Sequence, residues 1–264
     1  MDIVLVGCGN MGAAMLGGWM REAGALRFHV VDPSHTNRAR AAALGAECHA
    51  DVSELPHALE PRLIILAVKP QVMPEVVPAY ARFTGATGLS IAAGITIDAL
   101  SAWLDGLPVI RSMPNTPAAI GQGMIVSVAS DSVEAEVKSL AEGLLAAVGQ
   151  HAWVDDEALI DAVTAISGSG PAYVFHMIEC LADAARALDL PPDLADAMAL
   201  QTVAGAAALA ASAEEDPATL RKMVTSPKGT TEAGLGVLMG RLGPLLEDTA
   251  KAARDRGRAL GEGR

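Results

Sequence analysis

The chain has 264 residues, of which 51% are apolar and 3% aromatic, and its formal net charge is -12. That length holds one large domain or two modest ones, each with an aliphatic core. The negative charge argues against a nucleic-acid partner, because proteins bind polyanions through Lys and Arg side chains that neutralise phosphates.

The cysteines and the start of the chain bear on the compartment. Cys8, Cys48 and Cys180 are scattered and form no C-x-x-C pair, which is typical of a reducing compartment and of a protein with no metal site. No basic and apolar leader precedes the first strand. Charge or proline interrupts the apolar stretches short of the ~20 residues that a membrane span needs. We therefore expect a cytoplasmic protein with no membrane partner.

The first elements carry a dinucleotide-binding fingerprint. A predicted strand over residues 3–6 leads into the pattern G-x-G-x-x-G at residues 7–12, and an apolar helical stretch follows. In this pattern Gly7 permits the tight turn, Gly9 lets the backbone approach a pyrophosphate, and Gly12 lets helix and strand pack closely. Cys8 is interpreted as a small packing residue. We assign to the cofactor the loop residues Gly7, Gly9, Asn10, Met11 and Gly12.

The second predicted strand, residues 28–31, ends at an acid that bears on the choice of cofactor. Asp32 stands where an acid is expected to hold the ribose diol, which favours NADH. Ser34, Asn37 and Arg38 follow at once and are placed to hold a 2′-phosphate, which favours NADPH. We assign Asp32, Ser34 and Arg38 to the cofactor site and expect NADPH, with NADH as the alternative.

Short apolar runs then alternate with helical stretches. Strands are predicted at residues 63–68, 88–91, 109–110 and 124–128, followed by a helix from Asp131 to about residue 148 and a last strand at 151–154. This alternation predicts a mostly parallel sheet in a Rossmann-like dinucleotide-binding domain over residues 1–154. Loops at the carboxyl ends of such strands converge on one crevice. From these loops we assign Ala67, Val68, Lys69, Ala93, Gly94 and Asn115 to the cofactor.

After residue 154 the strand signal ends, and an all-helical domain is predicted over residues 155–264, with helix starts near Asp193 and Asp216. Two glycines and a proline interrupt the helical pattern at residues 167–171, either as a packing notch or as a surface facing the cofactor. Residues 195–213 are rich in alanine, and apolar helices of this kind predict a dimer interface.

A second ligand site is predicted at residues 224–231, just before a helix expected near Glu232. Hydroxyls and free backbone N–H groups at a helix N-terminus favour a carboxylate or phosphate. The alternative is that Thr231 serves only as an N-cap. The six histidines show no metal-ligand spacing, so the chemistry is expected to come from the cofactor. We assign to the substrate Ser226, Lys228, Gly229, Thr230 and Thr231.

Taken together, the motifs resemble the pyrroline-5-carboxylate reductase family over essentially the whole chain. The resemblance rests on the glycine loop and on residues 67–70, 92–94, 113–117, 161–164, 167–173 and 224–231. It implies reduction of 1-pyrroline-5-carboxylate to L-proline, the last step of proline biosynthesis. It also implies a helical domain that forms a homodimer or a larger homo-oligomer, and a substrate carboxylate held at residues 226–231, where we give Thr231 the catalytic position. Lys228 departs from the family, which usually has a small residue there, commonly Gly.

Two other functions are compatible with parts of the pattern. A β-hydroxyacid dehydrogenase shares the glycine loop and uses a Lys of its helical domain as acid–base, for which Lys222 and Lys228 are the candidates before Lys251. A module that only senses nicotinamide nucleotides has no use for a separate carboxylate site. The segment at 226–231 therefore argues for an enzyme.

Overall fold

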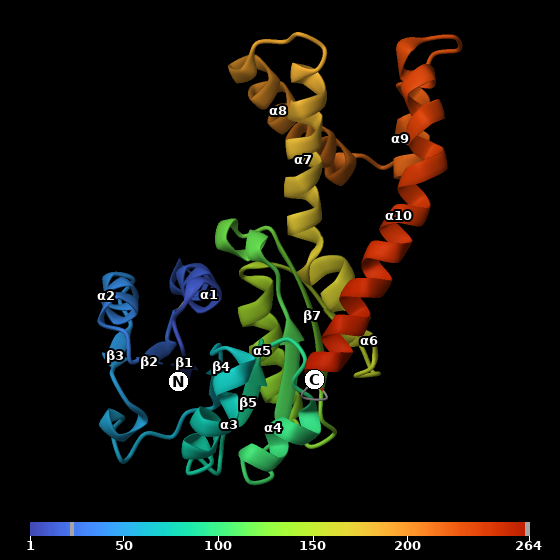
Figure 1. Cartoon of the computed structure of the whole chain (residues 1–264). Coiled ribbons are helices and arrows are strands. Elements are labelled where there is room, and N and C mark those ends of the chain that lie inside the picture. The colour runs from blue at the N-terminus through green and yellow to red at the C-terminus, as the bar shows by residue number, and fades with distance from the viewer. Residues whose placement is uncertain (22–23, 262–264) are drawn as a thin grey trace. The chain divides into compact units, whose positions relative to one another are not determined.

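The computed structural model describes residues 1–21 and 24–261, and its contacts divide the chain into two compact units. Unit 1 comprises Met1–Ser169 with Ala253–Arg264, and unit 2 comprises Gly170–Ala252. Figure 1 labels most of these elements. The strands are β1 (Asp2–Val6), β2 (Arg27–Val31), β3 (Glu47–His49), β4 (Leu63–Leu66), β5 (Thr87–Ser90), β6 (Val109–Met113), β7 (Gly123–Ala129) and β8 (Gly149–Trp153).

The described helices fall into two groups along the chain. Unit 1 contains α1 (Asn10–Arg21), α2 (His35–Ala43), α3 (Met73–Val76), α4 (Ile97–Trp103), α5 (Ala135–Ala146) and α6 (Leu159–Val163), together with short 3-10 turns. The later helices are α7 (Gly170–Arg186), α8 (Pro192–Ser212), α9 (Pro217–Met223) and α10 (Thr230–Gly261). The last turns of α10 belong to unit 1.

The sheet of unit 1 has the order β3-β2-β1-β4-β5-β6-β7-β8. Neighbouring strands from β3 through β6 are parallel, β7 runs antiparallel to β6, and β8 is parallel to β7. The first six strands have the order of a dinucleotide-binding Rossmann fold. The predicted fold class is therefore confirmed, with a mostly parallel sheet at the start of the chain and helices alone after β8 in the described residues.

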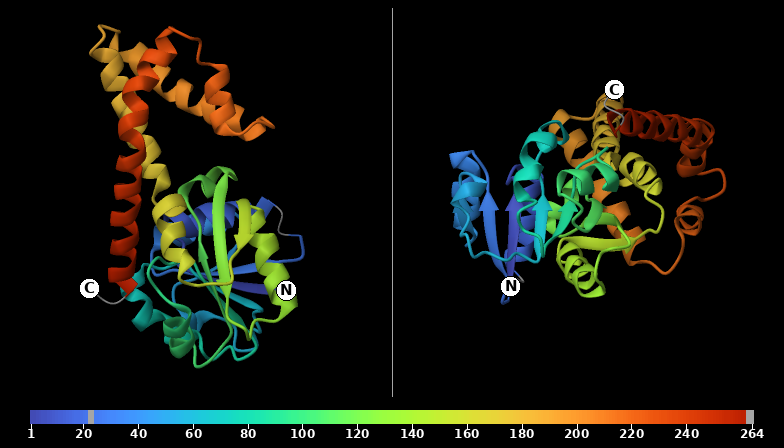
Figure 2. Two further views of the ribbon diagram at one scale, coloured as in Figure 1. Left: turned by 90° about the vertical axis from the view of Figure 1, so that its right-hand side faces the viewer. Right: turned by 90° about the horizontal axis from the view of Figure 1, so that it is seen from below.

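Both faces of this sheet are buried, so successive strand residues enter different cores. Ile3 and Leu5 pack in one core with residues of α1 and α5, whereas Val4 and Val6 pack in the other with residues of α3 and α4. Figure 2 shows the helices around the sheet from two further sides. Because both faces are covered, the open edge at the strand carboxyl ends is the place where an α/β sheet binds ligands.

Several element boundaries differ from the prediction. The edge strand β3 was not predicted, because three residues are too short to show a period. The helix expected from Asp131 begins at Ala135, and Glu134 precedes it without a side-chain capping bond. The helix expected near Glu232 begins two residues earlier, at Thr230.

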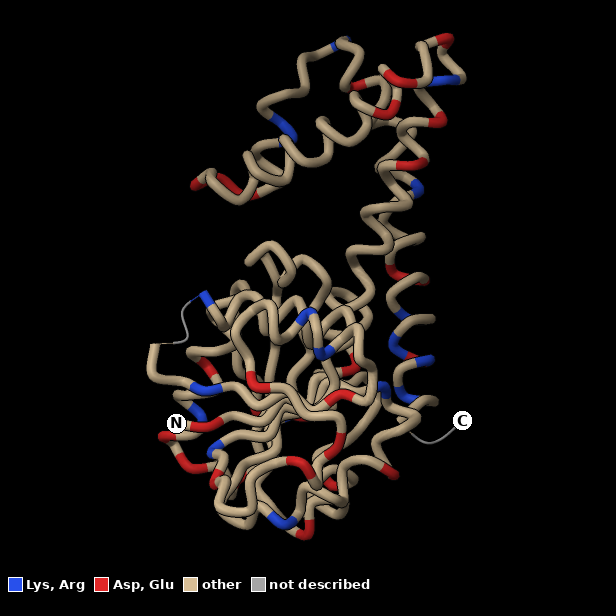
Figure 3. The backbone as a smooth tube through the Cα atoms, turned by 90° about the vertical axis from the view of Figure 1, so that its left-hand side faces the viewer, with Lys and Arg blue, Asp and Glu red and all other residues tan. Residues whose placement is uncertain are grey.

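Unit 2 is built from α7, α8, α9 and most of α10, and α7 packs on α8. The start signal at Asp216 is confirmed, because its side chain accepts hydrogen bonds from the N–H groups of Ala218 and Thr219. By length and composition alone α8 is long and apolar enough to cross a membrane, with a mean hydropathy of 1.4. Asp193 and Asp196 lie within it, and one such helix is weak evidence for a membrane span. Figure 3 marks the Lys, Arg, Asp and Glu residues along the backbone of the described chain.

The helix break expected at residues 167–171 is present as a π-helical turn over Thr164–Gly168, directly before α7. A Cβ on Gly168 would lie 2.7 Å from the Cε atom of Met113, at the end of β6. Gly168 therefore packs against Met113 inside unit 1, and a surface facing the cofactor stays the alternative prediction for this segment. The two compact units meet at Ser169, and the domain boundary expected at residue 154 stays a prediction.

Candidate cofactor and substrate sites

The three glycines of the loop after β1 have different surroundings. Gly7 has φ +87°, and a Cβ on it would lie 2.7 Å from Val68 Cγ1. A Cβ on Gly12 would lie 2.5 Å from the carbonyl oxygen of Gly7, so α1 approaches the loop too closely for any side chain. A Cβ on Gly9 would meet nothing within 4 Å. The first and third glycines are thus required by packing, while the space over the second is open to a ligand at the N-terminus of α1.

The carboxylate of Asp32 is buried and is used to connect two loops. Its Oδ2 atom accepts hydrogen bonds from the Cys8 N–H at 2.7 Å and the Asn37 side-chain amide at 3.0 Å. Its Oδ1 atom accepts one from the Ser34 N–H at 2.8 Å. A carboxylate offers about four acceptor positions, so little capacity remains for a ribose diol. In this structure Asp32 holds the glycine loop against the loop after β2.

Cys8 lies behind this carboxylate and is fully buried. Burial, with a smaller contribution from the Asp32 charge, raises the pKa of its thiol to about 11. The thiol therefore stays protonated at neutral pH, as a packing residue does and a nucleophile does not.

The loop after β2 presents polar groups at the N-terminus of α2. The Arg38 guanidinium donates through Nη1 to the carbonyl oxygens of Asp32 and Pro33, at 2.7 and 2.9 Å. The Ser34 hydroxyl accepts from the Asn37 N–H at 3.4 Å and caps α2. These bonds fix one positive side chain and one hydroxyl beside the helix N-terminus, where an anion is favoured.

The loops after β4 and β5 lie at the same carboxyl edge of the sheet. Ala67 and Val68 contact Gly7, whereas Lys69 is exposed and precedes a 3-10 turn. Gly94 has φ +77° and packs against the end of α10, since a Cβ on it would lie 3.2 Å from Leu260 Cβ. Ala93, beside it, is half-buried. The structure brings Ala67 and Val68 to the glycine loop and Gly94 to α10.

Asn115, after β6, is 8% exposed, and both ends of its amide are used. Its Oδ1 atom accepts from the Met124 N–H at 2.9 Å, and its Nδ2 atom donates to the Ser167 carbonyl at 3.1 Å. Asn115 therefore connects β6, β7 and the π-helical turn. Its contact with a cofactor stays a prediction.

The predicted substrate segment leads into α10, which begins at Thr230, and it is largely exposed. The Gly229 N–H donates to the Ser226 carbonyl at 3.0 Å, and a side chain on Gly229 would collide with the Ser226 hydroxyl. Gly229 accepts the Ala233 N–H and so takes the N-cap position. Because α10 begins at Thr230, Thr231 is not the N-cap, and the purely capping alternative for it was wrong.

Lys228 adopts a conformation that is unusual for a lysine. Its φ is +59°, in the left-handed region that favours glycine. Its N–H donates to the Glu232 carboxylate at 2.7 Å. That donor is therefore occupied, and the N–H groups of the first turn, at Thr230 and Thr231, are the ones left for a bound anion.

One buried ion-pair network was not predicted. Arg111, 3% exposed on β6, lies 2.8 Å from Glu157 and 3.4 Å from Asp161. Arg258 of α10 lies 3.6 Å from the other Asp161 oxygen, and Glu157 accepts the Ile97 N–H at 2.9 Å. The signal in the sequence was an arginine inside an apolar strand, because an arginine side chain is buried only when its charge is paired. Within unit 1, the network connects β6, α6 and the end of α10.

Comparisons with known proteins agree with this arrangement. Residues 157–260 match the family model described as pyrroline-5-carboxylate reductase dimerisation, and residues 2–94 match that described as NADP oxidoreductase coenzyme F420-dependent. The chain is 42% identical to a pyrroline-5-carboxylate reductase of Pseudomonas aeruginosa, with 98% of this chain and 97% of that protein covered. It is 36% identical to one of Pisum sativum, covering 94% of this chain and 92% of that protein.

Solved structures give the same result. The fold is similar to a pyrroline-5-carboxylate reductase from Coxiella burnetii, with a TM-score of 0.90, 33% identity and coverage of 98% of this chain and 97% of that one. It is also similar to the Plasmodium falciparum pyrroline carboxylate reductase with NADP bound, with a TM-score of 0.84, 26% identity and coverage of 99% and 98%.

Proposed function

The chain belongs to the pyrroline-5-carboxylate reductase family, and from this membership we propose that it reduces 1-pyrroline-5-carboxylate to L-proline with a reduced nicotinamide cofactor. The observation that carries the proposal is the 42% identity to a reductase over 98% of the chain. This membership sets aside both the β-hydroxyacid dehydrogenase and the sensor that does not turn over.

The residues at the carboxyl edge of the sheet fit a dinucleotide. The open space over Gly9 and the N-terminus of α1 suit a pyrophosphate, while Gly7 and Gly12 allow the backbone to come close. When bound, the reduced nicotinamide supplies the hydride that the imine carbon accepts, and the imine nitrogen carries the proton. No covalent nucleophile is required, in keeping with the protonated thiol of Cys8.

The substrate carboxylate is assigned to the start of α10. The free N–H groups of the first turn and the hydroxyls of Ser226, Thr230 and Thr231 supply donors to an anion. Thr231 is the residue to which we give the catalytic position, through orientation of the bound substrate. Lys228 adds a positive charge beside this segment.

For the cofactor, we favour NADPH over NADH. The Asp32 carboxylate is already bonded by Cys8, Ser34 and Asn37, whereas Arg38 and Ser34 stand where a 2′-phosphate is expected. Replacing Arg38 with Ala is expected to lower the preference for NADPH by about 10-fold or more, since a hydrogen bond to a charged group contributes roughly 1.5–3 kcal/mol. The ratio of kcat/KM for the two cofactors measures this, and an unchanged ratio would show that Arg38 does not read the phosphate.

The chain forms a homo-oligomer through its dimerisation region, and we propose that the unit is a dimer with two-fold symmetry, the commonest arrangement. Large apolar side chains of unit 2, such as Phe175 and Met239, are 58% and 57% exposed in one chain. Pairing of two copies buries such surfaces. The cytoplasmic location expected from the sequence stays a prediction.

The decisive experiment follows oxidation of NADPH and of NADH in separate assays with purified protein and 1-pyrroline-5-carboxylate. We expect loss of reduced-cofactor absorbance that depends on the substrate and yields proline. A 3-hydroxy acid with oxidised cofactor serves as the control and is expected to give no turnover. Absence of turnover with either reduced cofactor would contradict the proposed activity.

A further inference from the structure

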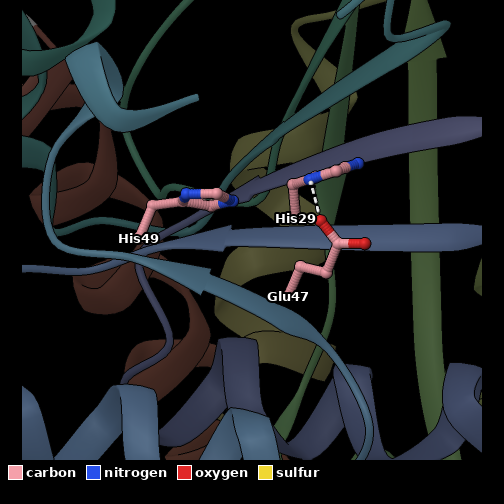
Figure 4. A group of neighbouring side chains, drawn as sticks. All are labelled: His29, Glu47 and His49. Atoms are coloured by element: carbon pink, nitrogen blue, oxygen red, sulfur yellow. Dashed lines mark ion pairs between the residues drawn. The ribbon is translucent and has the colours of Figure 1, made fainter. Parts of the chain in front are cut away.

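Three potential metal ligands meet at the β2–β3 edge of the sheet. In the parallel pairing His29 lies opposite Glu47, and Val31 lies opposite His49, so the three polar side chains share one face. Figure 4 shows the two rings and the carboxylate gathered there. Their ligand atoms lie within 4.8 Å of one another. Residues 20 positions apart in the sequence are thus brought together by strand pairing alone.

The ring of His29 is held in one orientation. It is 4% exposed, and its Nε2 atom lies 3.1 Å from the Asp2 carboxylate. The other ring nitrogen, Nδ1, lies 3.3 Å from the Glu47 carboxylate. The ring therefore turns one nitrogen toward Asp2 and the other toward Glu47.

His49 adds a second nitrogen without a partner. Its Nε2 atom and the Nδ1 atom of His29 are both buried and have no hydrogen-bond partner among the described residues. The two rings stack with centroids 5.8 Å apart. The Nε2 atom of His49 is thus a buried ring nitrogen available to an ion.

We propose that His29, Glu47 and His49 bind a divalent transition-metal ion of the zinc type. Two imidazoles and one carboxylate are a donor set that Zn²⁺ uses, with a fourth position left for water. The contact between Asp2 and His29 is the carboxylate–histidine pair that commonly orients a metal-binding ring. Bonds of about 2.1 Å place tetrahedral ligand atoms about 3.4 Å apart, and Glu47, with a side chain 63% exposed, is free to move inward.

The ion has a route from solvent and a defined structural effect. Asp2, His29, Glu47, Leu59 and Glu60 line an open groove beside the site. Bound metal would connect β3 to β2. The His49 carbonyl also accepts the N–H of Asp32 at 3.1 Å, so the connected edge supports the loop predicted to hold the cofactor ribose. The expectation of no metal site rested on cysteine spacing and on the spacing of histidines along the chain, and neither describes this edge.

The test is titration of the intact protein with ZnCl₂ against a chromophoric chelator at pH 7.5. Cys180→Ser serves as the background, because Cys180 and His176 are neighbours on an exposed face of α7 and offer a competing site. We expect one zinc ion per chain. Asp2→Asn should weaken binding about 10- to 100-fold, as loss of an orienting partner does, and Glu47→Gln and His49→Gln should weaken it at least as much.

His57→Gln is the matched control, since it removes an exposed histidine outside the cluster, and its affinity should equal that of the background. Glu47→Gln alters an exposed side chain, so it keeps the test valid even where a histidine variant does not fold. The visible spectrum of the cobalt-substituted background should show nitrogen and oxygen ligation. Zinc affinity that is unchanged in Glu47→Gln and His49→Gln, or binding that vanishes with Cys180→Ser alone, would overturn the proposal.

Discussion

Units 1 and 2 bury their side chains to very different extents. In unit 1 successive strand residues such as Ile3 and Val4 are completely buried in two separate cores. In unit 2 the buried residues are three alanines, Ala182, Ala195 and Ala199, while large apolar side chains of α7, α8 and α10 are exposed. A sheet covered on both faces completes its own core, whereas these helices need a second copy of the chain to bury theirs.

The largest effect is expected from a charge placed on the exposed apolar surface of unit 2. Phe175, on α7, is 58% exposed in one chain. If this surface is the subunit interface, Phe175→Glu buries an unpaired charge there and costs about 2 kcal/mol or more of association free energy, as substitution at an interface hot spot does. We expect monomers near 27.0 kDa by light scattering during size exclusion, with activity lost.

The matched control applies the same substitution to unit 1. Ile120 is 72% exposed and lies in a 3-10 turn beside the sheet. Ile120→Glu should leave the oligomer intact, because the contrast between the units assigns the interface to the helices. An active, stable Phe175→Glu monomer would remove the reason for treating unit 2 as incomplete.

The next largest effect separates two glycines of the same loop. A side chain on Gly12 meets the Gly7 carbonyl at 2.5 Å, and this backbone atom cannot rotate away. Gly12→Ala should therefore lower the free energy of unfolding of the cofactor-free protein by about 3 kcal/mol, at the upper end of the usual cost of overpacking. Denaturant titration measures it.

Gly9→Ala provides the comparison within the loop. A Cβ there meets nothing within 4 Å, so the free energy of unfolding without cofactor should stay unchanged while the Kd for NADPH rises. Equal destabilisation by both variants would mean that the space above Gly9 is not reserved for a ligand.

The sequence predicted the elements of unit 1 well because burial on both faces leaves strong apolar runs. It missed β3, since Glu47, Cys48 and His49 form a strand too short and too polar for a period to appear. It also assigned Asp32 to the cofactor, which stays a prediction, and did not show that the carboxylate connects two loops. Which donors surround a carboxylate depends on how two loops meet, and residue spacing does not record that.

Unit 2 was predicted to be helical and to form an interface. The sequence pattern did not show the backbone conformation of its predicted ligand segment. The hydroxyls and glycine of residues 226–231 indicated an anion site, and this assignment stays a prediction. The left-handed conformation of Lys228 was not readable, because lysine gives no sign of a positive φ. The resemblance to the family implied a small residue at this position, but it did not show the backbone strain that a lysine has there.

A smaller effect tests the assigned ligand of α10. If Thr231 donates to the substrate carboxylate, Thr231→Ala should raise KM about 10- to 150-fold, which corresponds to roughly 1.5–3 kcal/mol for a hydrogen bond to a charged group. Steady-state kinetics at saturating cofactor measures KM. The Kd for NADPH is the control and should not change. A raised cofactor Kd with an unaltered KM would move this segment from substrate to cofactor.

The smallest effect concerns the strained residue beside that segment. With φ +59°, Lys228 occupies a conformation that costs an L-residue roughly 1–2 kcal/mol, whereas glycine adopts it freely. The greater freedom of glycine in the unfolded chain offsets about 0.4–1 kcal/mol of the gain. Lys228→Gly should thus raise the free energy of unfolding by up to about 1.6 kcal/mol, or the Tm by a few degrees at most. Lys228→Ala removes the same charge but keeps the strain, so it should give no such gain.

Both variants lose an exposed charge worth roughly 0.2–1 kcal/mol to a nearby anion, and so both should raise KM by the same small factor. A higher KM in Lys228→Gly alone would mean that the backbone conformation, and not the ammonium group, holds the substrate.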